Sequence, residues 1–271
     1  MYNRVPKAGS SSMCALVRYL AVQNNFSYWI DADYFPDDDA LEEKIRTLEF
    51  GGVFLNHQFF YKVQQNVLSF TVVREPLAKA QSAFYYGVSE ARGSKGVEAL
   101  AERERDPLCG CAHMDFTDCI VLRDQNNCTK KSNSRSQTQS HFFCTNAEVR
   151  DDECTLQVAK SRLYHGYAAV GVIEHVDYTL KLFEKVFPRW FKGALYTYHH
   201  IPSSSLHATN AKERLAGCIS YEAQRILKAY PGYPLERDLY LAAEAHFWKQ
   251  VVLHDLITEE EDDEEEEKVA H

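Results

Sequence analysis

The sequence predicts an α/β fold, a parallel sheet covered by helices, in a single domain that spans residues 1–257. Three observations support this prediction. Short apolar segments alternate with amphipathic helical segments in the first third of the chain. Polar motifs follow three of the apolar segments, at the strand ends where parallel sheets bind ligands. The chain of 271 residues, 45% of them hydrophobic, is long and apolar enough to bury a substantial core.

Five segments have the length and the apolar character of strands. They are residues 2–5, 26–32, 53–55, 68–73 and 168–173. Apolar residues at helical spacing predict the helices between and after these strands. The predicted helices are residues 11–22, 39–50, 76–85, 155–165, 175–187 and 235–256, with a polar loop over residues 198–210. Pro76 suits the start of its helix, because its φ is fixed and its N–H is missing.

The net charge of −9 comes mainly from nine acidic residues at 259–267. We expect residues 258–271 to be a solvated, disordered tail. The rest of the chain is nearly neutral, so composition does not indicate a nucleic-acid-binding protein. No apolar run approaches the roughly 18 residues of a membrane span. The first residues resemble the inside of a strand, and we expect an upstream segment, with any signal or membrane anchor, to be missing.

The eight cysteines indicate an oxidising compartment. Four of them fall into two short pairs in a polar, irregular stretch, where two small disulfide loops would hold the chain in place. The pairs are Cys119 with Cys128 and Cys144 with Cys154. Two glycosylation sequons, at Asn25 and Asn127, agree with this compartment.

The remaining cysteines leave a metal site as an alternative. Cys109, Cys111 and His113 place three metal ligands close together, but zinc sites usually have wider gaps and a second pair of ligands. Unpaired thiols or a third disulfide are therefore favoured, with the pairing of Cys109 and Cys111 left open and no metal expected. Cys14 and Cys218 lie in helical patterns, where we expect small, buried, apolar side chains.

The segment VPKAGSSS, residues 5–12, has the composition of an anion-binding loop between a strand and a helix. Gly9 allows a tight turn, the first N–H groups of the helix point at the anion, and Lys7 adds a full charge. The nucleotide-hydrolase P-loop differs, because its lysine follows the second glycine. The alternative is a serine N-cap beside a surface lysine.

Two further strand ends carry candidate functional residues. Arg74 follows the clearest strand, and Ser82 lies about two turns into the next helix, so the pair could hold a phosphate. The alternative is a salt bridge and a serine that packs between helices. His57 follows another strand and has the side chain of a general base, although a lone histidine is more often structural.

Together these motifs resemble the two donor-binding motifs of the Golgi carbohydrate sulfotransferases, in particular the uronosyl 2-O-sulfotransferase branch. The first is YNRVPKAGSSS at residues 2–12, and the second is VREPL at residues 73–77 with SAFYY at residues 82–86. His57 falls where the branch has a histidine, and residues 168–174 and 188–194 resemble two later family segments. The resemblance covers roughly residues 2–256.

The resemblance implies a P-loop-like parallel sheet with helices on both faces, a disulfide-stapled loop region and a helical C-terminal part. It implies transfer of a sulfuryl group from 3′-phosphoadenosine 5′-phosphosulfate to a sugar hydroxyl in the Golgi lumen. The implied donor site consists of Lys7, Ala8, Gly9, Ser10, Ser11, Ser12, Arg74 and Ser82. Lys7 would also stabilise the leaving oxygen, and His57 would take the proton of the acceptor hydroxyl. Arg4 and Asn56 would contact the substrate.

The implied partner is a polysaccharide acceptor, most simply the 2-O position of a uronic acid in a glycosaminoglycan; a homo-oligomer stays open. Leu55 stands where the heparan enzyme of the branch has another histidine, and the basic stretch after the second motif is thin. These departures keep two alternatives open. One is a sulfotransferase with a less charged acceptor, and the other is a non-catalytic protein that binds the donor or a glycan.

Overall fold

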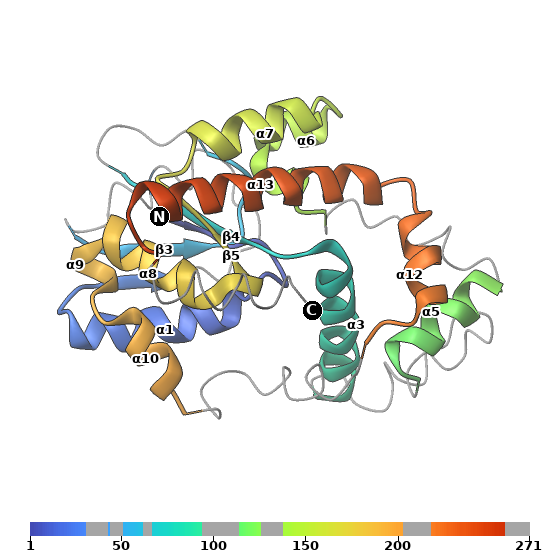
Figure 1. Cartoon of the computed structure of the whole chain (residues 1–271), viewed down its shortest axis with the longest axis horizontal. Helices are drawn as coiled ribbons and strands as arrows, with labels where there is room; N and C mark the ends of the chain where they lie inside the picture. The colour runs from blue at the N-terminus through green and yellow to red at the C-terminus, as the bar shows by residue number, and fades with distance from the viewer. Residues whose placement is uncertain are drawn as a thin grey trace.

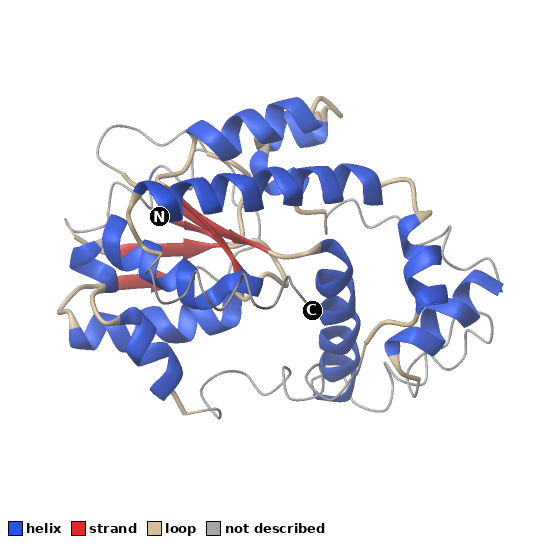
Figure 2. Ribbon diagram, viewed as in Figure 1, coloured by secondary structure: helices blue, strands red, loops and turns tan. Residues whose placement is uncertain are grey.

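Five parallel strands form one sheet in the order β2–β3–β1–β4–β5 (Figures 1 and 2). The structure is a computed structural model that describes residues 1–30, 43, 51–61, 67–93, 114–125, 138–202 and 218–257. The strands are β1 (Tyr2–Asn3), β2 (Tyr28–Ile30), β3 (Val53–Asn56), β4 (Phe70–Val73) and β5 (Ala169–Val172). This sheet confirms the predicted α/β fold.

The burial of the strands within the sheet explains why their sequences are short apolar runs. Every residue of β1, β3, β4 and β5 is buried, as expected for parallel strands covered on both faces. Tyr2 lies between Leu55 and Phe70 in the register, and its ring stacks on that of Phe70 with centroids 4.9 Å apart. The predicted strand 2–5 ends early because the chain turns at Val5, whose carbonyl accepts from the Ala8 N–H.

Helices cover both faces of the sheet. The α-helices are α1 (Ser10–Gln23), α3 (Pro76–Gly93), α5 (Phe116–Gln125), α6 (Asn146–Arg150), α7 (Leu156–His165), α8 (Val176–Val186), α9 (Pro188–Phe191), α10 (Ala194–His200), α12 (Tyr221–Lys228) and α13 (Tyr233–Leu253). In the described part of the chain, the 3₁₀ turns are η3 (Ser140–Phe143) and η4 (Ile173–His175). In Figure 1, α7 and α13 lie above the sheet, and α1 and α10 lie below it.

Five of these helices, α5, α6, α9, α10 and α12, were not predicted, and α10 replaces part of a predicted loop. Helix α10 occupies the start of the predicted polar loop 198–210, because exposed residues such as Tyr196 and His199 hide its helical period. Helices α5 and α12 bury few apolar side chains, and they pack on each other around Phe116 and Ile226. Helix α6 has no buried residue at all.

The two cysteines predicted to be buried behave differently. Cys14 is buried in α1, as predicted. The prediction for Cys218 is wrong: its side chain is exposed, and it precedes α12 instead of lying in a helix. The predicted helix 39–50 lies outside the described residues apart from position 43. The same holds for Cys109, Cys111, His113, Cys128, Asn127 and the tail 258–271.

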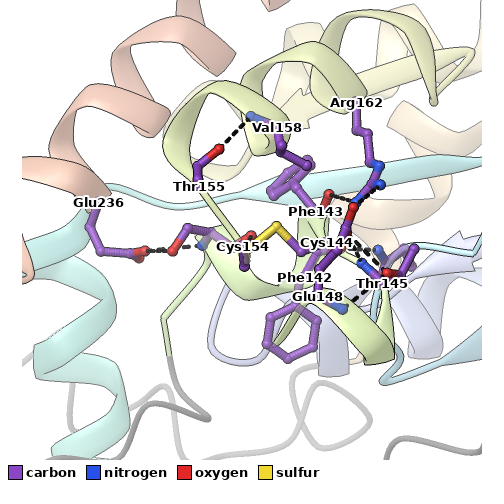
Figure 3. Close-up of a disulfide and its surroundings, with 12 residues drawn as sticks. Phe142, Phe143, Cys144, Thr145, Glu148, Cys154, Thr155, Val158, Arg162 and Glu236 are labelled. Carbon is purple, nitrogen blue, oxygen red and sulfur yellow. Dashed lines mark hydrogen bonds and ion pairs between the residues drawn. A yellow bond between two sulfur atoms is a disulfide. The ribbon is translucent and has the colours of Figure 1, made fainter. Parts of the chain in front are cut away.

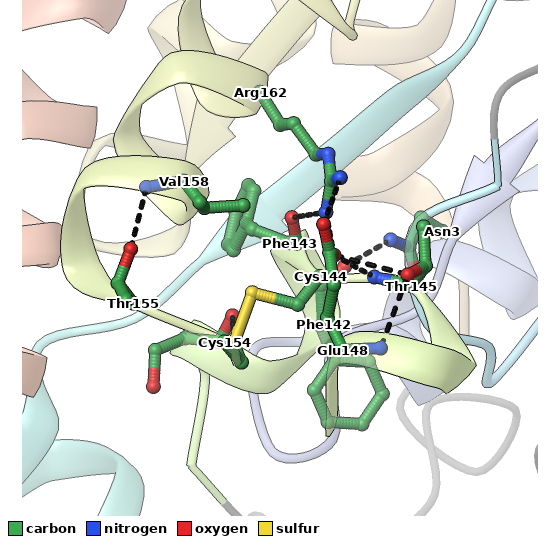
Figure 4. Close-up of polar contacts among 11 residues, drawn as sticks. Asn3, Phe142, Phe143, Cys144, Thr145, Glu148, Cys154, Thr155, Val158 and Arg162 are labelled. Carbon is green, nitrogen blue, oxygen red and sulfur yellow. Dashed lines mark hydrogen bonds and ion pairs between the residues drawn. A yellow bond between two sulfur atoms is a disulfide. The ribbon is translucent and has the colours of Figure 1, made fainter. Parts of the chain in front are cut away.

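A disulfide and an ion pair hold the segment between η3 and α7 in place (Figures 3 and 4). Cys144 and Cys154 form the predicted disulfide, which closes a small loop around α6. Cys119 is also disulfide-bonded. Thr145 and Glu148 form a capping box at the start of α6, and Arg162 of α7 binds both carboxylate oxygens of Glu148.

Replacing Arg162 by methionine is expected to lower the free energy of unfolding by about 2–3 kcal/mol, because it leaves a partly buried carboxylate without its partner. The hydrogen bonds from Arg162 are the largest cause that lowers the pKa of Glu148 to about 2. The stability gained is present above pH 4.5 and is lost as the pH falls toward 2. Urea unfolding at pH 7 and pH 3 checks both effects.

Arg150→Met is the matched control for this pair. Arg150 pairs with Asp151 on the surface, where an ion pair contributes less than about 1 kcal/mol. Equal losses of stability in the two variants would contradict the role assigned to Arg162.

No helix among the described residues is both long and apolar enough to cross a membrane.

Candidate active site

The candidate site lies at the carboxyl edge of the sheet, where β1 lies between β3 and β4. The chain leaves β1 toward β2 and β3 on one side of the sheet and returns to β4 on the other. Such a reversal of strand order opens a crevice beyond the strand ends, and open parallel sheets bind their ligands there. The three polar motifs follow β1, β3 and β4, so the topology brings them to one edge.

The loop between β1 and α1 has two residues in the left-handed region, Lys7 at φ 64° and Gly9 at φ 78°. Gly9 is the N-cap of α1, and no side chain caps this helix. The alternative of a serine N-cap is therefore wrong. The first N–H groups of α1 have no partner within the helix and are available to an anion. Ser10 and Ser12 are buried beside them, whereas Ser11 is exposed.

Glycine is the only residue type that fits position 9 of the loop without strain. A Cβ at this position would lie 2.5 Å from Cδ1 of Ile173, which follows β5, and its positive φ disfavours any other residue. We therefore expect Gly9→Ala to lower the free energy of unfolding by about 2 kcal/mol and to weaken anion binding by the loop.

Chemical denaturation and phosphate titration check this prediction. Gly232→Ala is the control, since Gly232 has a negative φ and a Cβ there would meet no atom closer than 3.9 Å. The expectation for Gly9 fails if both alanine variants unfold at the wild-type urea concentration.

Arg74 connects the second motif to the loop. Its Nη1 donates to the carbonyl oxygen of Lys7 at 3.2 Å, so the guanidinium lies beside the loop. The next residue, Glu75, accepts the Ala78 N–H at 2.8 Å and thereby caps the start of α3. Ser82 lies on α3 and is 3% exposed. The structure thus brings Arg74 to the loop and places Ser82, buried, on the helix that follows it.

The ammonium group of Lys7 lies over the ring of Tyr86, with Nζ 3.8 Å from the ring centroid. Tyr86 comes from α3, the helix that also carries Ser82. Aromatic faces attract cations, so this contact helps to hold the lysine side chain at the carboxyl edge. The backbone of Lys7 is strained, and its side chain is held in place. Both features are typical of functional residues.

His57 directly follows β3 and is 7% exposed. Its Nδ1 lies 2.6 Å from the carbonyl oxygen of Arg4. A carbonyl can only accept, so Nδ1 carries the proton and Nε2 is the basic nitrogen. Burial is the largest cause that lowers the pKa of His57 to about 4, and the positive charges of Arg4 and Lys7 lower it further. The ring is therefore neutral at pH 7, as a general base must be.

Next to His57, the structure leaves buried polar atoms without partners. Asn56 is fully buried, and neither its Nδ2 nor its Oδ1 has a hydrogen-bond partner in the described part of the chain. The same holds for Nε of Arg4, whose backbone N–H donates to the Asn56 carbonyl. Buried polar atoms are usually paired, so these unpaired atoms next to His57 are exceptions. Leu55, by contrast, belongs to the hydrophobic core.

Sequence reasoning missed several residues that surround the site. Gln139, Glu236 and Glu174 contact the residues around Arg74 from loops and helices far away in the chain. No local pattern marks them, because each matters only through a tertiary contact. Within the described ranges, no group of three or more histidine, cysteine or acidic side chains is arranged to hold a metal ion.

Comparisons with known proteins agree with this geometry. Uronyl 2-sulfotransferase of Mus musculus is 24% identical over 268 residues, which cover 92% of this chain and 63% of that protein. Heparan sulfate 2-O-sulfotransferase 1 of Gallus gallus is 22% identical over 271 residues, covering 90% of this chain and 72% of its own length. Heparin sulfate O-sulfotransferase of Drosophila melanogaster is 26% identical over 269 residues, which cover 91% of this chain and 71% of that protein.

The chain thus spans 63% of the length of the uronyl 2-sulfotransferases that it matches. Residues 1–230 also match the sulfotransferase family as a whole. That match includes the loop after β1, His57, Arg74 and Ser82. Because it covers far more than half of the 271 residues, this chain belongs to the sulfotransferase family.

Proposed function

We propose that this protein transfers a sulfuryl group from 3′-phosphoadenosine 5′-phosphosulfate to a hydroxyl of a polysaccharide. One observation carries the proposal: the loop after β1, Arg74 and neutral His57 meet at the carboxyl edge of the sheet. An anion-binding loop, a second cationic group and a base are the parts that such a transfer needs.

The loop and Arg74 fit the two anionic ends of the donor. The free N–H groups of α1, the ammonium group of Lys7 and the hydroxyls of Ser10 to Ser12 would hold the 5′-phosphosulfate. Gly9 and Ala8 let the backbone approach the anion closely. Arg74 and Ser82 would hold the 3′-phosphate. Bound in this way, the donor supplies an activated sulfuryl group, and Lys7 would stabilise the charge that develops on the leaving oxygen.

His57 would activate the acceptor. Its Nε2 takes the proton from the sugar hydroxyl as the oxygen forms its bond to sulfur, while Nδ1–H stays bound to the Arg4 carbonyl and fixes the ring. The sulfuryl group carries less negative charge than a phosphoryl group, so Lys7 and N–H donors suffice without a divalent cation.

For the acceptor we propose the 2-O position of a uronic acid in a glycosaminoglycan. The unpartnered Nε of Arg4 and the amide of Asn56 lie beside His57 and offer polar contacts for such a sugar. The relatives named for 2-O-sulfation of uronyl or heparan sulfate groups support this choice.

We further propose that residues 1–257 form the catalytic domain. The Cys144–Cys154 disulfide supports a location in the Golgi lumen.

The test is a transfer assay with labelled donor and a panel of desulfated glycosaminoglycans and uncharged glycans, with His57→Ala as the comparison. Label that enters carboxylated acceptors and depends on His57 supports the proposal. Label that enters only uncharged glycans would keep the enzyme and replace the acceptor. Tight binding of adenosine 3′,5′-bisphosphate without any transfer would favour a non-catalytic binding protein.

A further inference from the structure

The backbone of Arg74 is paired by a side chain and not by a strand. Beyond Thr71, the last residue of β4 that pairs with β1, the register between these strands ends, and β5 pairs only as far as Val73. Gln139 fills this position. Its Oε1 accepts the Arg74 N–H at 2.9 Å, and its Nε2 donates to the Arg74 carbonyl at 2.6 Å. The amide of Gln139 thus extends the pairing of β4 by one residue.

Gln139 is in turn held by a buried carboxylate of α13. The backbone N–H of Gln139 donates to Oε2 of Glu236 at 2.7 Å. The N–H and the hydroxyl of Ser140 donate to Oε1 of the same residue at 3.0 and 2.8 Å. Gln139 is 1% exposed and Glu236 is 8% exposed. Figure 3 shows Glu236 reaching from its helix toward this loop.

Two further contacts stabilise this arrangement. Lys79, on α3, is also buried, and its charge interacts with that of Glu236, so the carboxylate is not an isolated charge. The Cys144–Cys154 disulfide lies on the other side of Ser140, whose carbonyl is 3.8 Å from the sulfur of Cys154. Gln139 and Ser140 are therefore held by Glu236 and lie next to the disulfide.

We infer that Gln139 is a positioning residue that sets the place of Arg74, and with it the preference of the site for a ligand with a 3′-phosphate. Arg74 is held at its backbone by Gln139 and at its guanidinium by the carbonyl of Lys7. Its distance from the loop after β1 is then fixed before any ligand binds, as precise recognition of two anionic groups requires. This inference rests on the proposed function, in which Arg74 binds the 3′-phosphate.

The test compares the affinities for adenosine 3′,5′-bisphosphate and adenosine 5′-monophosphate by calorimetry. Gln139→Met keeps the length of the side chain and removes both hydrogen bonds. We expect the ratio of the two affinities to fall about tenfold, because only the bisphosphate uses Arg74. In the transfer assay the KM for the donor should rise by a similar factor, with kcat at saturating donor within about threefold of the wild-type value.

Gln250→Met is the matched control. The side-chain amide of Gln250 also pairs with backbone, at the start of β5, where it accepts the Val170 N–H at 3.1 Å and donates to the Ala168 carbonyl at 3.2 Å. It lies at the amino end of the sheet, away from the site. Its loss should lower the melting temperature without changing the affinity ratio. If Gln139→Met does not fold, Ser140→Ala, which loosens the same loop, should shift the ratio in the same direction.

Arg74→Ala separates this inference from the proposed function. If Gln139 acts through Arg74, the double variant Gln139→Met/Arg74→Ala should have the affinity ratio of Arg74→Ala alone. A wild-type ratio in folded Gln139→Met, while Arg74→Ala loses the preference, would overturn the inference. A wild-type ratio in Arg74→Ala would instead remove Arg74 from the proposed 3′-phosphate site.

Discussion

Replacing Lys7 by methionine is expected to lower kcat for sulfuryl transfer by about 10²–10³, the effect of removing one preorganised charge from a developing oxyanion. The variant removes the ammonium group, and with it the contact of Nζ with the Tyr86 ring, but keeps most of the apolar side chain. The Arg74 contact uses the carbonyl of Lys7, which methionine retains. Affinity for adenosine 3′,5′-bisphosphate should therefore fall much less than kcat. Steady-state kinetics and calorimetry on the same preparation measure the two quantities.

Lys181→Met is the control for the loss of a lysine from an aromatic ring. Nζ of Lys181 lies 4.7 Å from the centroid of the Tyr178 ring on α8, away from the candidate site. Its kinetics should match those of the wild type. An unchanged kcat in Lys7→Met would exclude Lys7 from the transition state and leave the loop as a binding element only.

Lys7→Gly separates catalysis from backbone strain. Lys7 has a φ of 64°, a region in which a residue with a Cβ costs about 1–2 kcal/mol and glycine does not. The glycine variant should be as inactive as Lys7→Met, yet remain within about 1 kcal/mol of the wild type in unfolding free energy. The loss of activity would then come from the missing charge and not from an unfolded loop.

The sequence was most informative where structure is local. The loop after β1 could be predicted because its strand, its glycine and its helix are consecutive, and a strand–glycine–helix order forces the N–H groups outward. The sheet could be predicted because parallel strands are buried on both faces and therefore read as apolar runs. The Cys144–Cys154 disulfide could be predicted from a short spacing within a polar stretch.

The sequence was least informative where a residue acts through a distant contact. Gln139 and Glu236 have no partner nearby in the chain, and only the packing of α13 beside β5 and α3 gives them a role. Cys218 was misjudged because a cysteine counts as apolar in a periodic pattern, although this one precedes its helix and is exposed. Helix α12 was not predicted, because its two buried residues, Ala223 and Ile226, are too few to define a helical period.

Replacing His57 by alanine is expected to lower kcat by about 10²–10⁴, the usual contribution of a general base. Adenosine 3′,5′-bisphosphate should bind with nearly wild-type affinity, because His57 belongs to the acceptor side of the proposed site. His246→Ala is the control: burial also lowers the pKa of His246, but its ring packs on Tyr164, away from the site. A fall in kcat common to both variants would show a general effect of histidine loss on the fold.

The pH dependence gives an independent test of the same residue. A base with a pKa of about 4 stays unprotonated at neutral pH, so kcat/KM should be flat from about pH 5 to 7 and fall below about pH 4. The pKa of His57 is lower in the folded than in the unfolded protein. Between its ordinary value of 6.5 and about 4, the unfolded chain therefore binds more protons, and stability falls as the pH falls through this window.

The lowered pKa of His57 corresponds to about 3 kcal/mol of stability lost between pH 6.5 and pH 4. His57→Gln, which has no titrating group, should lack this loss, so its urea midpoint should change less with pH than that of the wild type. If wild type and variant lose stability in parallel from pH 6.5 to 4, His57 is not held neutral by its surroundings. An acid limb of kcat/KM near pH 6.5 would lead to the same conclusion. If the kinetic and stability profiles both give a pKa near 4, the group that acts as the base is the buried ring of His57.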